Sequence, residues 1–327
     1  MYKYILVPLD GSKSSQGVLP YAKQIAKGLD IPIVLLHAID LRGLPSEEIE
    51  RGRDIVPTDY SEEFRHAIET TQPSQPKHFR YLDMVIEKEK AIAQAYLNPV
   101  AHDLEAQGIK VERVVEIGSP YQEILRYAEG RRVGLIAMST HGRSGISRWA
   151  LGSVADRVLY GAKSNLLLLR PDVEVTTKKE FSNIVLPLDS SKVAECALPV
   201  ASYLAKNLAT PIHLVEVISI STEIWVGAEP LAYYPTSIFS DIEDAAVKYL
   251  DGIKGKLEED GLQVDRRTLV GAAAARIVDY TAEIPDSLIV MATHGRSGLR
   301  KWALASVADK IVRSSGRPVL LVRPPEE

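Results

Sequence analysis

The sequence predicts an α/β protein of two tandem, doubly wound domains, each built around a five-stranded parallel sheet. Two observations support this prediction. One sequence pattern occurs twice within the 327 residues, and in each copy short apolar runs alternate with helical segments. The length agrees, because a domain of about 150–170 residues is large enough to bury its own core.

The repeat consists of two blocks that stand at different offsets. Residues 3–40 align with residues 182–219 at an offset of 179. Residues 138–157 align with residues 291–310 at an offset of 153, and both contain T-H-G-R-S-G. The two offsets differ by 26 residues, so the first copy carries extra length between about Asp40 and Gly118.

Each copy contains five short apolar runs, bounded by turn residues and often rich in valine and isoleucine, which predict buried strands. In the first copy the runs are 3–8, 32–39, 111–117, 132–139 and 164–169. In the second they are 183–188, 211–218, 264–270, 286–292 and 317–323. Strands that alternate with helices predict a parallel sheet with right-handed connections and helices on both faces.

Helices are predicted between the strands from apolar periodicity and from end signals. Residues 14–29 place apolar side chains near one helical face. A longer helix is predicted over 83–107, with a kink or break at Asn98-Pro99. The segment 119–122, Ser-Pro-Tyr-Gln, has the form of a capping box with proline at the first helical position. A further helix begins with Ser153–Leu159.

The domains are predicted at residues 1–171 and 182–327, with a polar linker at about 172–181. The first domain contains an insertion at about 41–80, which is rich in proline and charge. Loops of this length are uncommon unless they are functional or disordered.

The composition excludes several classes of function. A formal net charge of −4 gives no reason to expect nucleic-acid binding. Cys196 is the only cysteine, so no internal disulfide can form, and a reducing cytoplasm is the expected location. The beginning of the sequence has no signal-peptide core, and no apolar run approaches the roughly 20 residues that span a bilayer. We therefore expect no membrane partner.

The candidate site follows from the predicted sheet, because doubly wound sheets bind ligands beyond their carboxyl strand ends, where the strand order reverses. Asp10 ends the first strand, Ala38 lies near the end of the second, and residues 139–145 follow the fourth. Glycines in that last segment allow a turn whose N–H groups converge on an anion. Gly152-Ser153 then opens a helix, whose N-terminus can bind phosphate, and Arg143 could add a charge-assisted contact.

These segments resemble the ATP-binding branch of the universal stress protein family. That branch is marked by a glycine, two residues, a second glycine, nine residues, and then glycine with serine or threonine. Here the second glycine is Gly142 and the final pair is Gly152-Ser153, whereas Ser139 replaces the first glycine. The resemblance covers both copies, including the V-P-L-D segment of the first strand, and the order, spacing and duplication of these elements make it specific.

The resemblance implies a universal stress protein fold, related to the adenine nucleotide alpha hydrolase-like fold, with strand order 3-2-1-4-5 and with ATP as the expected ligand. Mg²⁺ could accompany the ATP. The implied site in the first domain comprises Pro8, Leu9, Asp10, Ala38, Met138, Ser139, Thr140, His141, Gly142, Arg143, Ser144, Gly145, Gly152, Ser153 and Val154. A second, weaker site comprises Pro187, Asp189, Val217, Met291, Gly295, Arg296, Ser306 and Val307. The second site is expected to be weaker because Ala292 and Ala305 replace two glycines of the pattern.

Several of these residues also have purely structural interpretations. Asp10 could cap the first helix instead of contacting a ligand, and Gly142 and Gly145 could serve only a tight turn. We expect no catalytic role for His141 or His294, because neither has a positioned partner. No dedicated metal site is predicted, and Asp10 is the one candidate for helping to hold Mg²⁺.

Three functions are compatible with the sequence. The first is a nucleotide-binding regulatory or stress-response protein whose ATP-bound form is recognised by a protein partner. Because the sequence has no Walker-type phosphate loop, at most slow ATP hydrolysis is expected. The second is an enzyme on a related fold, such as a nucleotidyltransferase or an ATP pyrophosphatase, but neither H-x-G-H nor S-G-G-x-D-S follows the first strand. The third is an interaction scaffold without nucleotide, which Ala305 favours for the second domain.

The resemblance also implies dimers in which the last strands of two domains pair. In this chain the runs 164–169 and 317–323 could pair with each other, because an open edge at Leu166–Leu169 would favour aggregation. We therefore expect an internal pseudo-dimer, which could associate further into a homodimer.

Overall fold

The computed structural model describes residues 2–41, 77–140, 151–170, 180–219, 236–293 and 306–324. Most of the predicted insertion, residues 42–76, and most of the predicted linker, residues 171–179, lie outside these ranges. The domain boundaries therefore stay a prediction.

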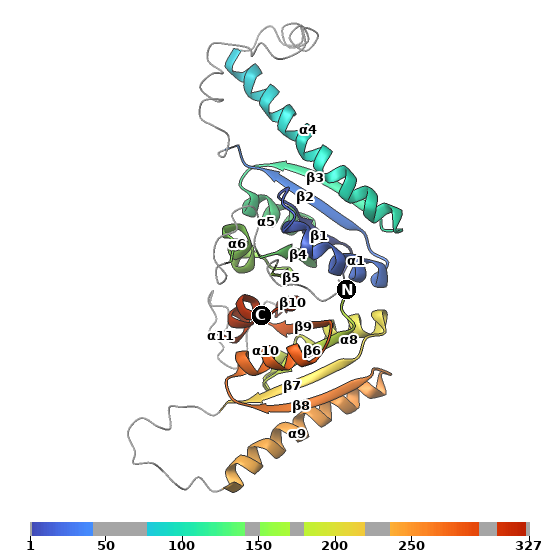
Figure 1. Cartoon of the computed structure of the whole chain (residues 1–327), viewed down its shortest axis with the longest axis vertical. Coiled ribbons are helices and arrows are strands. Elements are labelled where there is room, and N and C mark those ends of the chain that lie inside the picture. Colours follow the sequence, from blue (N-terminus) through green and yellow to red (C-terminus); the bar gives the residue numbers. More distant parts are fainter. Residues whose placement is uncertain are drawn as a thin grey trace, which may run out of the picture.

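The strands of the described residues form one ten-stranded sheet in the order β3-β2-β1-β4-β5-β10-β9-β6-β7-β8 (Figure 1). The strands of the first half are β1 (Ile5–Pro8), β2 (Ile33–Ile39), β3 (Val111–Ile117), β4 (Leu135–Ser139) and β5 (Asn165–Leu169). Those of the second half are β6 (Asn183–Leu188), β7 (Ile212–Ile218), β8 (Val264–Val270), β9 (Ser287–Ala292) and β10 (Val319–Val322). All ten lie within the predicted runs. Each half has the strand order 3-2-1-4-5 with parallel pairing, which confirms the predicted fold class.

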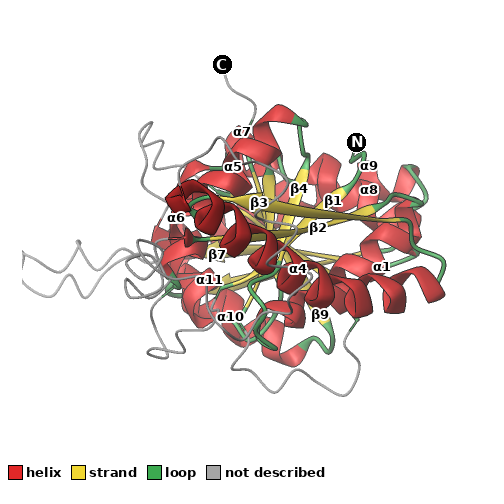
Figure 2. Cartoon of the chain, turned by 90° about the horizontal axis from the view of Figure 1, so that it is seen from above, coloured by secondary structure: helices red, strands yellow, loops and turns green. Residues whose placement is uncertain are grey.

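Helices cover both faces of this sheet (Figure 2). One face packs against the 3₁₀ turn η1 (Ser15–Val18) and the helices α1 (Leu19–Leu29), α4 (Lys77–Ala106), α7 (Lys192–Glu195), α8 (Leu198–Leu208) and α9 (Thr236–Glu259). The other packs against α5 (Pro120–Gly130), α6 (Ser153–Gly161), α10 (Ala273–Glu283) and α11 (Ser306–Ser314). Side chains alternate between the two cores: Leu167 faces the first and Leu166 and Leu168 the second, as the two-residue period of a strand requires.

Three helix predictions need correction. The segment 14–29 is a 3₁₀ turn followed by an α-helix, with Pro20 near the start of the α-helix. The long helix α4 begins at Lys77, within the predicted insertion, and continues through Pro99 without a break. Leu97 and Ala101 on either side of the proline are fully buried, so packing outweighs the lost backbone hydrogen bond. Ser119 is the N-cap of α5 and Pro120 begins the helix, as predicted, but the Ser119 side chain makes no capping hydrogen bond.

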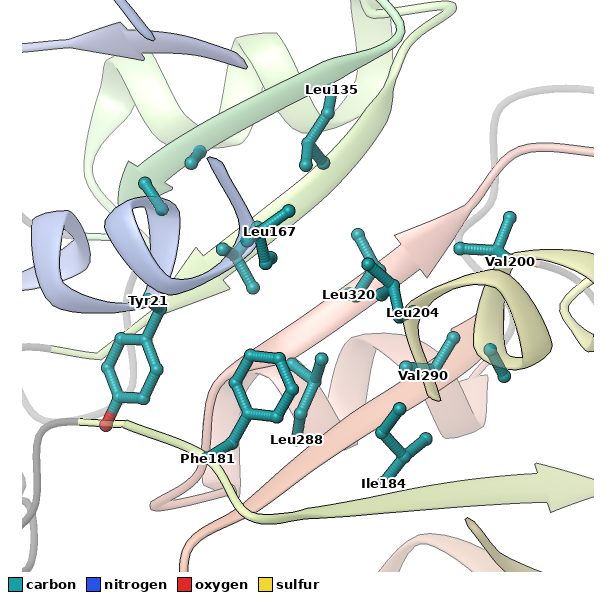
Figure 3. Close-up of a cluster of buried hydrophobic side chains, with 14 of the residues drawn as sticks. Tyr21, Leu135, Leu167, Phe181, Ile184, Val200, Leu204, Leu288, Val290 and Leu320 are labelled. Atoms are coloured by element: carbon teal, nitrogen blue, oxygen red, sulfur yellow. The ribbon is translucent and has the colours of Figure 1, made fainter. Parts of the chain in front are cut away.

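The two halves join through antiparallel pairing of β5 with β10, in which Leu320 lies opposite Leu167. The prediction that these last strands pair within the chain is therefore confirmed. The apolar core continues across this junction, from Tyr21 and Leu135 in the first half to Leu204 and Val290 in the second (Figure 3). Among the described helices, none is both long and apolar enough to cross a membrane.

Candidate functional site

A cavity of about 250 Å³ lies beyond the carboxyl ends of β1 and β4, where the strand order of the first half reverses. Ten residues of the predicted ATP site line it: Pro8, Leu9, Asp10, Ala38, Met138, Ser139, Thr140, Gly152, Ser153 and Val154. The structure thus brings together residues that are up to 146 positions apart in the chain, counting from Pro8 to Val154. The other predicted members, His141, Gly142, Arg143, Ser144 and Gly145, lie outside the described residues.

A network of short hydrogen bonds shapes the loop after β1. Asp10 Oδ1 accepts from the backbone N–H of Ser12 at 2.9 Å and from its hydroxyl at 2.6 Å. The Ser12 hydroxyl oxygen in turn accepts from the N–H of Ser15 at 3.1 Å. Gly11 between them has φ of +89°, which a residue without Cβ adopts at little cost. Asp10 therefore closes the loop ahead of η1 and does not cap the first helix, which corrects that structural alternative.

The N-terminus of α6 forms the opposite wall of the cavity. Gly152 is its N-cap and offers no side chain to satisfy the first N–H groups of the helix. The N–H of Gly152 itself already donates to the carbonyl oxygen of Thr140 at 2.7 Å. The amides of Ser153, Val154 and Ala155 follow, at the positive end of the helix dipole. This end of α6 can accept an anion without a charged side chain.

Ser139, which replaces the first glycine of the family pattern, has an identifiable role. Its hydroxyl donates to the carbonyl oxygen of Ser14 at 2.6 Å, which ties the end of β4 to the segment before η1. The side chain is thereby fixed toward Ser14, and a glycine here would lose this bond.

Five further residues line the cavity that the sequence reasoning did not identify: Ser15, Leu36, Pro120, Ile124 and Ala155. Leu36 stands two positions before Ala38 on β2, so strand periodicity alone could have indicated it. Pro120 and Ile124 come from the first turns of α5, for which the family pattern gives no signal.

The second half repeats the loop but differs beside it. Asp189 Oδ1 accepts from the N–H of Ser191 at 3.1 Å, as Asp10 accepts from Ser12. At the position aligned with His37, the second half carries Glu216, which is buried and accepts from the hydroxyl of Ser190 at 2.8 Å. Pro187 lies within β6. Met291 is buried in the core on the α10 and α11 face of the sheet, and Val217 and Val307 pack against that core. Gly295, Arg296 and the side chain of Ser306 lie outside the described part of the chain.

Among the side chains that the structure describes, no group of three or more His, Cys, Asp or Glu is arranged to hold a metal ion. The polar groups of the cavity are instead hydroxyls, the Asp10 carboxyl and the backbone at the start of α6. Such a set suits a ligand with a partly apolar body and an anionic group.

The fold and this cavity define a tandem, doubly wound α/β protein with a candidate ligand site at the switch point of its first half. The model of the universal stress protein family matches residues 1–170 and 180–323, and the chain belongs to this family.

Relatives match one half of the chain or the whole of it. Universal stress protein MJ0531 of Methanocaldococcus jannaschii is 29% identical over 147 residues, which are 45% of this chain and 85% of the relative. Universal stress protein Slr1230 of Synechocystis is 22% identical over 322 residues, which are 98% of this chain and 100% of the relative. The crystal structure of a universal stress protein from Archaeoglobus fulgidus is similar in fold, with a TM-score of 0.64, 23% identity, and coverage of 98% of this chain and 96% of that one.

Proposed function

We propose that the first domain binds ATP in the switch-point cavity and that the protein acts as a nucleotide-dependent regulator in a stress response. One observation carries the proposal: residues from β1, β2 and β4 surround a single cavity that the N-terminus of α6 also borders. The ribose and base fit the apolar side, next to Ala38 and Met138. The phosphates fit beside Ser153 and Val154, whose amides lie at the positive helix end.

We further propose that ATP is held and not turned over. Rapid phosphoryl transfer needs a carboxylate that holds the metal and a group that positions the nucleophile. The Asp10 carboxyl is engaged with Ser12 through two hydrogen bonds, so its Oδ1 stabilises the loop. Incubation with ATP followed by product analysis tests this point: unchanged ATP supports a binding role, whereas AMP and pyrophosphate would indicate an enzyme.

The second domain fits nucleotide less well, and we propose that it binds ATP weakly or serves as a scaffold. Glu216 places a buried carboxyl beside the Asp189 loop, where the first domain carries His37. That carboxyl accepts from Ser190 and stands at a position whose counterpart, His37, does not line the first-domain cavity. The case for weaker binding therefore rests on Ala292 and Ala305, which replace two glycines of the family pattern.

A substitution at the start of α6 tests the site in the first domain. Gly152→Asp adds a negative side chain at the helix N-cap, where the proposed phosphates lie. Aspartate stabilises a helix at that position, so a weaker ATP complex would not reflect unfolding. We expect the affinity for ATP in titration calorimetry to fall at least about tenfold, which is about 1.4 kcal/mol.

The matched control is Gly130→Asp, at the end of α5, where an added Cβ meets no atom within 4 Å. This variant carries the same change in charge and should bind ATP as the unaltered protein does. Equal affinity of Gly152→Asp and the unaltered protein would show that ATP binds elsewhere or not at all.

A further inference from the structure

A second and larger cavity lies next to the switch-point cavity, between η1, α1 and α4. Its volume is about 930 Å³, and none of the described residues of the proposed ATP site lines it. The 3₁₀ turn separates the two: Ser14 and Gly17 line the larger cavity, whereas Ser15 lines the smaller one. The end of β5 closes the larger cavity with Leu169 and Arg170. Its size is within the range of about 300–1,000 Å³ that is typical of small-molecule sites.

Its walls are largely apolar and come from three elements. Leu19 and Pro20 belong to α1, Val100 and Leu104 to α4, and Leu169 to β5. Leu104 and Leu169 are part of the buried core, so the floor of the cavity is fixed by packing. Such walls favour the apolar body of a ligand, which leaves water when it binds.

The charges that line the cavity are mainly positive. Among the described residues that line it, the ionisable side chains are those of Lys13, Lys23, Arg170 and Asp103, together with the phenols of Tyr21 and Tyr96. Lys23 donates to Gln107 Oε1 at 3.0 Å, and the same amide donates from its Nε2 to Asp103 Oδ2 at 3.1 Å. The cavity therefore carries a formal excess of positive charge in a protein whose net charge is −4.

The second half repeats this lining only in part: Lys192, Leu198, Pro199 and Leu257 stand where the first half has Lys13, Leu19, Pro20 and Leu104. Where the first half has Gly17, Lys23 and Asp103, the aligned residues of the second are Cys196, Ser202 and Lys256. Cys196 is half-buried and packs against the core. The combination of Gly17, Lys23 and Asp103 is thus specific to the first half, whereas most of the apolar positions are common to both halves.

We propose that this cavity binds an amphipathic organic anion, with an apolar body against α1, α4 and β5 and an acidic head group beside Lys13 and Lys23. Charge complementarity favours this class: a neutral ligand of the same shape gains only the apolar contacts, and a cation is repelled by the two lysines. The proposal does not depend on whether the neighbouring cavity holds ATP.

The probe that tests it is 1-anilinonaphthalene-8-sulfonate, an aromatic sulfonate whose fluorescence increases in apolar surroundings. Titration of the full-length protein without nucleotide should give saturable binding of one probe per chain. Decanoate should displace the probe, whereas decanol and decylamine at the same concentration should not. Displacement by decanol as effective as displacement by decanoate would overturn the proposal.

Variants locate the binding. The double variant Lys13→Gln/Lys23→Gln should weaken probe binding about tenfold, because it removes two partly solvated charges. Lys192→Gln, at the position aligned with Lys13, is the matched control and should bind normally. Val100→Trp should abolish binding by filling the space between α4 and α1.

A wild-type affinity in the double lysine variant would overturn the proposal. That variant should fold normally, because Lys13 is exposed and Lys23 is only partly buried. Gly152→Asp should bind the probe normally. Loss of the proposed nucleotide site and loss of this site are therefore distinguishable.

Discussion

At the scale of single residues, serine hydroxyls stabilise the loop beside the candidate ATP site, and one of these serines, Ser139, stands where the family pattern has a glycine. Ser12, Ser15 and Ser139 hold the loop after β1 and join it to β4. The sequence indicated which positions meet at this site, because the family pattern and the strand ends identify them. It did not indicate which backbone amides already donate a hydrogen bond within the protein. The N–H of Gly152, for example, donates to the carbonyl oxygen of Thr140, and this contact depends on tertiary packing.

Cys196 allows a prediction about pH at this scale. Burial raises the pKa of its thiol to about 11, so the reactive thiolate is scarce at neutral pH. Alkylation of the folded protein by iodoacetamide should be slow at pH 8 and should rise about tenfold per pH unit up to pH 10. In urea the rate should level off near pH 9, because an exposed thiol has a pKa of about 8.5. A plateau near pH 9 in the folded protein would contradict this account.

At the scale of elements, the apolar runs identified every described strand, and periodicity or end signals identified four helices of the first half, while helix ends and interruptions were less predictable. The proline in α4 is the clearest case. Local rules place a kink or break at Asn98-Pro99, because proline lacks the N–H that the carbonyl of Ala95 would accept. The helix nevertheless continues, since Leu97 and Ala101 are buried against the sheet and hold both sides of the proline in place. The continuity of α4 through Pro99 therefore depends on tertiary contacts, which the local sequence does not reveal.

Pro99 should therefore reduce the stability of the protein. Pro99→Ala restores a backbone donor at an exposed position, and we expect the free energy of unfolding to rise by about 1–3 kcal/mol in urea denaturation. Asn98→Ala, at the adjacent exposed position, serves as the control and should add only about 0.5 kcal/mol. Unchanged or lower stability of Pro99→Ala would mean that the proline fits the helix without strain.

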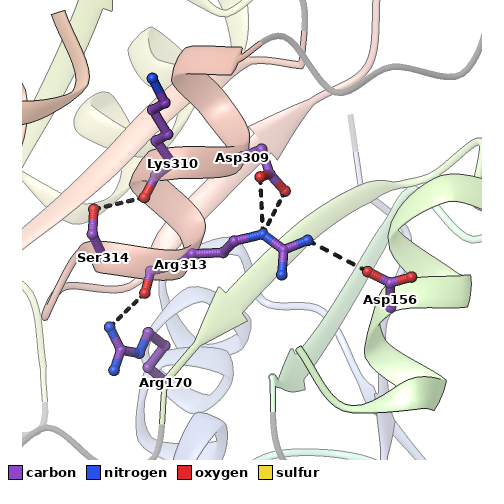
Figure 4. Close-up of polar contacts among 6 residues, drawn as sticks. All are labelled: Asp156, Arg170, Asp309, Lys310, Arg313 and Ser314. Atoms are coloured by element: carbon purple, nitrogen blue, oxygen red, sulfur yellow. Dashed lines mark hydrogen bonds and ion pairs between the residues drawn. The ribbon is translucent and has the colours of Figure 1, made fainter. Parts of the chain in front are cut away.

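At the scale of the whole molecule, pairing of β5 with β10 turns two similar halves into one continuous sheet. Side chains reinforce this junction from both halves. Arg170 at the end of β5 donates to the carbonyl oxygen of Arg313 at 2.6 Å (Figure 4). The guanidinium of Arg313 forms an ion pair with Asp156, with 3.6 Å between Nη2 and Oδ1. Arg323 after β10 donates in the opposite direction, to the carbonyl oxygen of Leu159. Both arginines thus meet the carboxyl-terminal part of a helix in the other half, where a cation is favourable.

The junction should be sensitive to a buried charge. Leu167 is fully buried opposite Leu320, so Leu167→Glu places a carboxyl group in the shared core without a partner. We expect a loss of about 3 kcal/mol or more in the free energy of unfolding, together with larger species in gel filtration. Ile92→Glu, whose side chain on α4 is 53% exposed, should change the stability by less than about 0.5 kcal/mol. Similar stability of both variants would show that the strand junction does not hold the halves together.

The most direct test of the central claim is native mass spectrometry of the full-length protein after incubation with ATP. We predict one ATP per chain at low nucleotide concentration, retained in Gly130→Asp and lost in Gly152→Asp. A chain that carries no nucleotide, or that keeps its ATP in Gly152→Asp, would contradict the placement of the site in the first domain.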